Sequence, residues 1–215
     1  MKVIASCTSL LLLVACAVPP VRDAPKLTPI VVPSGTTTNE IELGPVVARL
    51  SSDGSLGIQF GMLCQPAASR PAPADRLPVT QGDIGRAFKA VFGSLRYRTK
   101  EVPDSVFVAS PAALRLGGTV TRLEASLCFP YSGSPALNVG DPSRAKGSAF
   151  VEVVWELYST SEGRVIFKRS VAGRFETEET VQGGIGTVVL NALSASLTNL
   201  AADSEFYAAA AKPVP

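Results

Sequence analysis

The sequence predicts an α+β domain: a mostly antiparallel sheet of about five to six strands with two helices packed on one face. Two observations predict this class. Several stretches alternate apolar and polar residues with the period of a strand, and two others repeat apolar residues at the spacing of a helix. The 215 residues leave room for one domain and its tails. We expect a single domain over residues 39–210.

The first expected elements are strands. Residues 40–50 and 56–63 predict one hairpin that turns at residues 51–54. The stretch over 66–78 is rich in proline and predicts a long surface loop. Residues 105–108 are a short candidate strand.

Two helices are expected. The first begins after Thr80, because Thr80 and Asp83 form a capping pattern at its start. Its apolar residues recur at helical spacing: Ile84, Phe88, Val91, Phe92 and Leu95. The second helix spans about 184–203 and has one apolar side. Its other side is expected to face solvent and carries Asn191, Ser194, Ser196, Thr198, Asn199 and Asp203.

Three further strands are expected between the helices. Residues 114–129 alternate, but the phase slips near Thr121, which indicates a β-bulge. Residues 149–158 place Glu152 and Glu156 on a solvated face. The strand over 164–176 follows a hairpin turn with glycine at residue 163.

The N-terminus predicts a lipoprotein signal peptide over residues 1–15. A lysine precedes an apolar run of 13 residues, which is too short to cross a bilayer. The run ends in Leu-Val-Ala-Cys, which resembles a bacterial lipobox with Cys16 as the acylated residue. The alternative is an ordinary signal peptide cut after Ala15 or Ala17. Residues 16–38 then hold the lipidated Cys16 and a Pro-rich tether.

Ala17 bears on the location of the protein. It follows Cys16, whereas an Asp at this position would resemble a signal for retention in the inner membrane. We therefore expect an outer-membrane protein on the periplasmic face, held by the lipid on its N-terminus. After removal of Cys7 and acylation of Cys16, Cys64 and Cys128 remain. In an oxidising compartment this pair predicts a disulfide. Two buried free thiols are the alternative.

Composition excludes several classes of function. The chain has no histidine, which removes Ser-His-Asp and Cys-His nucleophiles and any His-ligated zinc or haem. The net charge of +2 does not suggest a nucleic-acid partner. Neither a phosphate-binding loop nor a calcium loop is present. We expect no catalytic residue, no metal and no cofactor, although Glu-rich strand faces leave an enzyme that uses carboxylates as a minor alternative.

The stretch over 129–147 is long for a connection between neighbouring strands and carries Phe129, Tyr131 and three prolines. Long loops in compact domains are functional or disordered. A Cys64–Cys128 bond would join its start to the loop over 66–78. We therefore expect these two loops to form a docking surface, with Phe129 and Tyr131 as its aromatic anchors.

A pattern over roughly 80–205 resembles small α+β envelope lipoproteins of proteobacteria. It comprises Gly118-x-Val120, the run from Val151 to Tyr158, Gly163-Arg-Val165 and a late helix. The resemblance is to auxiliary lipoproteins of ABC-type transport or secretion assemblies, and to uncharacterised domains that precede trypsin-like proteases. It implies a non-enzymatic accessory or docking subunit with an envelope protein as partner. A periplasmic domain that binds a small ligand or lipid is the alternative.

Overall fold

The structure is a computed structural model that describes residues 21–52, 54–60, 64–72, 75–100, 112–130 and 141–211. Its elements follow the chain in the order β1 (Ile41–Ala48), β2 (Ser55–Phe60), β3 (Gln65–Pro71), α1 (Gln81–Ser94), β4 (Leu114–Phe129), β5 (Arg144–Ser159), β6 (Arg164–Gln182), α2 (Gly184–Leu200) and α3 (Ser204–Ala211). The expected strand over 105–108 lies outside the described residues.

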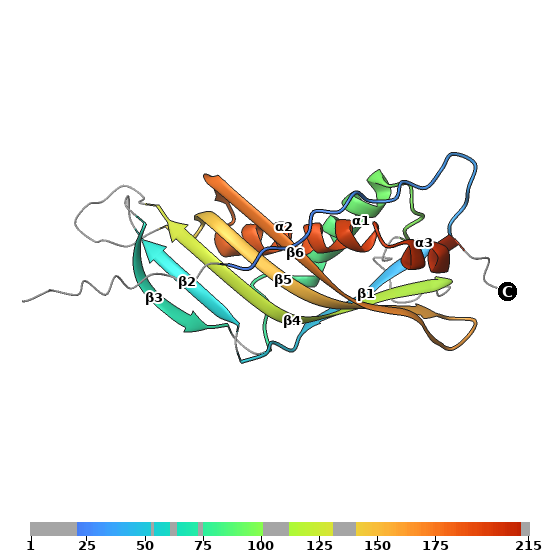
Figure 1. The fold of residues 1–215 in the computed structure, drawn as a ribbon, viewed down its shortest axis with the longest axis horizontal. Coiled ribbons are helices and arrows are strands. Elements are labelled where there is room, and N and C mark those ends of the chain that lie inside the picture. Colours follow the sequence, from blue (N-terminus) through green and yellow to red (C-terminus); the bar gives the residue numbers. More distant parts are fainter. Residues whose placement is uncertain are drawn as a thin grey trace, which may run out of the picture.

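The expected α+β class is confirmed (Figure 1). The strands form one sheet in the order β3-β2-β4-β5-β6, and β1 pairs with β4. The β2–β3, β4–β5 and β5–β6 pairs are antiparallel, while β1 and β2 both run parallel to β4. The expected bulge near Thr121 is present as a register shift between Val120 and Arg122. Gly163 has the positive φ of +65° expected in the β5–β6 hairpin turn.

The hairpin expected over 40–63 is wrong. β1 pairs with the first half of β4 and β2 with its last five residues, so the two strands lie in series along one edge of β4. The chain between them does not reverse. Backbone N–H groups of Arg49 and Ser51 donate to the carbonyls of Val120 and Thr121. A strand of 16 residues has an edge long enough for both shorter strands, and this pairing prevails over the local turn signal.

Part of the surface loop expected over 66–78 is also wrong, because Gln65–Pro71 form β3. β3 lies at the end of the strand order and pairs only with β2 among the described strands. An edge strand tolerates proline, since one side of its backbone needs no partner. Pro66 and Pro71 are therefore compatible with β3, even though prolines in the sequence indicate a loop.

Helix α1 forms as expected. The backbone N–H of Asp83 donates to the Thr80 hydroxyl at 3.1 Å, and the N–H of Thr80 donates to the Asp83 carboxylate at 3.2 Å. The hydrogen bond from the Thr80 side chain lowers the pKa of Asp83, which favours the charged carboxylate at the helix start. Ile84, Phe88 and Phe92 are buried.

The second helix differs from the expectation in length and exposure. α2 ends at Leu200, and Asp203 begins α3 by accepting hydrogen bonds from the backbone N–H groups of Glu205 and Phe206. No residue of α2 is largely exposed to solvent. The helix contacts β5, β6 and α1, and the segment over 21–39 passes beside it (Figure 1). The side expected to face solvent is therefore covered, and Ser196 and Asn199 are buried.

A short hydrogen-bonded chain joins α2 to the sheet. The indole N–H of Trp155, on the core side of β5, donates to the Ser196 hydroxyl at 3.0 Å. Ser196 in turn donates to the carbonyl of Val171 on β6 at 3.0 Å. These bonds satisfy two polar groups that would be costly to bury alone. Glycines make room for this contact: a Cβ on Gly118 would lie 2.7 Å from the Trp155 ring.

An aromatic cluster closes the core beside α3. The Phe92 ring lies 5.1 Å from Tyr97 and 5.7 Å from Phe206, and Phe167 lies 5.5 Å from Phe206. Burial raises the pKa of Tyr97 to about 12. Phe206 is fully buried, so α3 packs into the same core as the sheet.

None of the described helices is by itself long and apolar enough to cross a membrane; α2 and α3 meet that test only as a pair, bent by 75°.

The close approach of α2 to β6 generates a stability prediction. A Cβ on Gly173 would lie 2.2 Å from the carbonyl oxygen of Ala192 and 2.3 Å from the nitrogen of Ser196, both backbone atoms. We expect Gly173→Ala to lower the free energy of unfolding by about 1–3 kcal/mol, measured by urea denaturation.

The matched control is Gly85→Ala. Gly85 lies within α1 and nothing stands within 4 Å of a Cβ added there. The same substitution should raise the free energy of unfolding by about 0.5–1 kcal/mol. Equal stability of Gly173→Ala and the wild type would contradict the packing described here.

Candidate functional site

The helices leave one face of the sheet uncovered, and we call this the outer face. Its side chains alternate with the core residues along β4, β5 and β6, and charged pairs cross it from strand to strand. Arg122 lies 3.7 Å from Glu152 and Lys168 lies 2.7 Å from Glu156, each on a neighbouring strand, and Arg174 lies 2.8 Å from Glu176 within β6. The solvated position expected for Glu152 and Glu156 is confirmed, because both are partly exposed on this face. Ion pairs of this kind make the outer face a charged surface.

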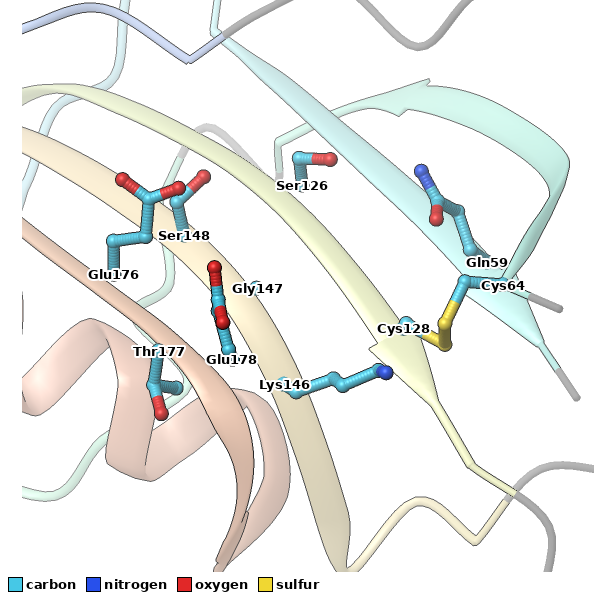
Figure 2. Close-up of a pocket in the computed structure, with 10 residues that line it drawn as sticks. All are labelled: Gln59, Cys64, Ser126, Cys128, Lys146, Gly147, Ser148, Glu176, Thr177 and Glu178. Carbon is cyan, nitrogen blue, oxygen red and sulfur yellow. A yellow bond between two sulfur atoms is a disulfide. The ribbon is translucent and has the colours of Figure 1, made fainter. Parts of the chain in front are cut away.

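An open hollow of about 530 Å³ lies on the outer face where β2, β4, β5 and β6 meet (Figure 2). Its lining is mostly polar: Gln59, Cys64, Ser126, Cys128, Lys146, Gly147, Ser148, Glu176, Thr177 and Glu178. Lys146 supplies a positive charge on β5, and two glutamates supply negative charges on β6. Figure 2 shows the Lys146 side chain extended toward the disulfide, away from these glutamates.

The expected Cys64–Cys128 disulfide is present, with Cα atoms 5.2 Å apart. It joins the residue before β3 to the penultimate residue of β4 and closes a separation of 64 residues. In the chain-entropy account, a loop of this size contributes about 4 kcal/mol to stability. The bond also forms one wall of the hollow, so it holds the β2–β3 pair against the end of β4.

The expected docking surface stays a prediction, although the structure changes the segments that would form it. The disulfide does join the two segments, but residues 144–147 belong to β5 and residues 66–71 belong to β3. Phe129 is 6% exposed and lies in the hydrophobic core, which leaves it little surface for a partner. It is the last residue of β4 and falls on the core face of that strand. Tyr131 and Cys16 lie outside the described residues.

Sequence reasoning missed a second feature, the N-terminal strap, which we define as residues 21–39. This segment was expected to be a tether, yet its described residues lie against the domain. The backbone N–H of Arg22 donates to Glu124 at 3.1 Å, and its guanidinium lies 2.9 Å from the same carboxylate. Asp23 pairs with Arg174. Further along, Val32 donates to the carbonyl of Leu95 and Asn39 to that of Ala210.

Asn199 holds the strap at the edge of β6. Its side-chain amide donates to the carbonyls of Pro25 at 2.7 Å and Ala172 at 2.9 Å, and its oxygen accepts from the N–H of Leu27 at 3.0 Å. One buried side chain therefore connects α2, β6 and the strap. The sequence signal was available but ambiguous, because an asparagine on the polar side of a helix usually faces water.

In the parts of the chain that the structure describes, no group of three His, Cys, Asp or Glu side chains is placed to hold a metal ion.

Comparison with known proteins gives no family, because no family model matches the chain and no curated protein matches it. Several solved structures are similar. The protein XCC0632 from Xanthomonas campestris is 15% identical, with a TM-score of 0.37, over 88% of this chain and 92% of that one. The hypothetical protein CT253 from Chlamydia trachomatis is 7% identical, with a TM-score of 0.33, over 65% and 74%.

A minor lipoprotein from Acinetobacter baumannii is 10% identical, with a TM-score of 0.30, over 84% of this chain and 99% of that one. Similarity at these identities and TM-scores carries no argument about function.

The role of Asn199 can be tested by substitution. Asn199→Ala leaves two carbonyls and one N–H without their partner, so it should lower the free energy of unfolding by about 1–3 kcal/mol. It should also speed amide hydrogen exchange at residues 25–32 more than in the sheet. Asn191→Ala, on the same helix, is the control and should change stability by less than about 0.5 kcal/mol. Unchanged exchange in the strap of Asn199→Ala would show that other contacts hold it.

Proposed function

We propose that this protein is an envelope lipoprotein, anchored through Cys16 on the periplasmic face of the outer membrane, that docks on a larger envelope assembly. The observation that carries the proposal is the lipobox at residues 13–16, which follows an apolar run of signal-peptide length. Two or three acyl chains hold a protein stably on a membrane, whereas one chain holds it only marginally.

A role other than catalysis is supported by the chemistry of the outer face. Glu152 and Glu156 are paired with arginine and lysine on neighbouring strands, Glu176 is paired with Arg174 on its own strand, and the chain has no histidine to act as a base. A carboxylate that serves as an acid or base needs a pKa shifted toward the working pH, which an adjacent cation opposes. We therefore assign the protein no reaction, and we propose an accessory role in transport or assembly.

A domain that binds a small ligand or lipid is the second candidate, and the hollow in Figure 2 is the observation that favours it. Its volume falls within the range of ligand sites, about 300–1,000 Å³. Its lining argues against this candidate, since ligand sites are mostly apolar and this one carries Lys146, Glu176 and Glu178. A polar, open hollow suits a surface contact better than an enclosed ligand.

Removal of the proposed anchor tests the first half of the proposal. Cys16→Ser removes the thiol that would receive the lipid. We expect the variant to appear in the soluble periplasmic fraction or to remain as an uncut precursor, whereas the wild type partitions with outer membranes. Fractionation followed by intact-mass measurement distinguishes these forms. A processed Cys16→Ser protein that still sediments with membranes would rule out the lipid anchor.

The docking half is tested at Tyr131, which follows the end of β4 by two residues. Tyr131→Ala should abolish capture of the partner from detergent-solubilised envelopes while leaving the urea midpoint unchanged. Tyr158→Ala is the matched control, because Tyr158 is 38% exposed and pairs with Arg115 near the opposite end of β4. Proteins retained by the wild type and by Tyr158→Ala, but lost from Tyr131→Ala, identify the partner. Equal capture by both variants would move the docking surface away from this loop.

A further inference from the structure

We propose that the outer face of the sheet lies against the membrane, with the bilayer surface as its partner. This inference rests on the proposed anchor at Cys16, and it adds the orientation of the domain. The three observations that carry it are the length of chain between Cys16 and the first docked residue, the place where that chain docks, and the side chains on the docked face.

The chain length limits how far the domain can stand from the bilayer. Six residues of chain lead from Cys16 to Arg22, where the strap is already held by Glu124. An extended chain spans at most 3.3–3.6 Å per residue, so the reach from the lipidated residue to this contact is about 20 Å at most. A tether free along residues 16–38 would allow several times that distance.

The place where the strap contacts the sheet indicates which face of the domain lies toward the membrane. Glu124 lies on β4, in the interior of the sheet, and Arg174 lies on β6; both project from the outer face. Figure 1 shows the start of the described chain crossing the middle strands before it runs on beside α2. The strap crosses the β6 edge at Asn199 only after it has left the outer face. The chain from the lipidated residue therefore reaches the domain on the outer face, while the helices lie on the opposite side of the sheet.

The Arg22–Glu124 contact is firm enough to fix this point. Glu124 is 7% exposed and is approached by two cations, Arg22 at 2.9 Å and Arg122 at 3.6 Å. The backbone N–H of Arg22 donates a further hydrogen bond to the same carboxylate. Release of the strap would break both contacts of Arg22 with Glu124 while Arg122 stayed beside it. The loss of these charge-assisted bonds opposes release of the strap at this position.

The side chains of the outer face suit a bilayer surface. Both signs of charge are present along β4, β5 and β6, which fits headgroups that carry phosphate and ammonium together. Among the described residues, three of the five large apolar side chains that are exposed lie on this face: Val47, Tyr158 and Val165. Tyrosine prefers the boundary between headgroups and water.

Energy transfer to the membrane tests this orientation. The full-length lipidated protein is reconstituted into phosphatidylethanolamine–phosphatidylcholine vesicles that carry an acceptor dye on a headgroup. A genetically encoded fluorescent amino acid replaces either Glu178, exposed on the outer face, or Ala90, exposed on α1. We expect higher transfer from position 178 than from position 90. Equal transfer, or higher transfer from position 90, would overturn the proposed orientation.

Vesicle flotation and the mass of the N-terminal peptide report the anchor separately. An acylated protein that floats with the vesicles but does not show higher transfer from position 178 than from position 90 would overturn the orientation alone. An unacylated protein that does not float would overturn the anchor and the orientation together. A second variant tests the role of chain length: about twenty Gly and Ser residues inserted between Pro20 and Val21 add roughly 25 Å of flexible reach. The difference in transfer should shrink in this variant. An unchanged difference would overturn the claim that the short segment sets the orientation.

Discussion

The length of β4 constrains the rest of the fold. This strand of 16 residues pairs with β5 along one edge and with β1 and β2, in series, along the other. The bulge between Val120 and Arg122 marks the point where one neighbour gives way to the next. Because β2 and its partner β3 depend on the second half of β4, the disulfide from Cys64 to Cys128 reinforces the pairing that is farthest from the helices.

The opposite layer depends on close approach between α2 and the sheet. Gly173 lets the backbone of the helix come down onto β6, and the Trp155–Ser196–Val171 bonds supply the polar contacts that a buried helix requires. Because α2 packs closely on the sheet, its polar side contacts the strap instead of facing solvent. Asn199 then connects the strap to β6, so that the helix core and the path of the N-terminus are parts of one packing arrangement.

This arrangement ties the proposed anchor to the domain. A lipid attached to a freely swinging tether would leave the orientation of the domain open, but a strap held at Glu124, Arg174 and Asn199 does not. If the outer face rests on the bilayer, then the helices that cover the other face of the sheet face the periplasm. Phe129, the last residue of β4, lies at the sheet end marked by the disulfide.

The sequence by itself determined the α+β class, the cap and apolar face of α1, the bulge in β4, the β5–β6 hairpin and the disulfide pair. Each of these depends on residues that are close in the chain, or on a cysteine count that left one pairing. Only the tertiary structure decided that β1 and β2 lie in series on β4, that β3 exists despite Pro66 and Pro71, and that Phe129 is buried.

The strap shows the physical reason most clearly. Its prolines and lack of periodicity are those of a free tether, and no local pattern distinguishes the two states. What holds it are contacts across more than a hundred residues, from Arg22 to Glu124 and from Pro25 and Leu27 to Asn199. Such contacts depend on where the folded sheet and α2 place their polar groups, and that placement exists only once the whole domain has packed.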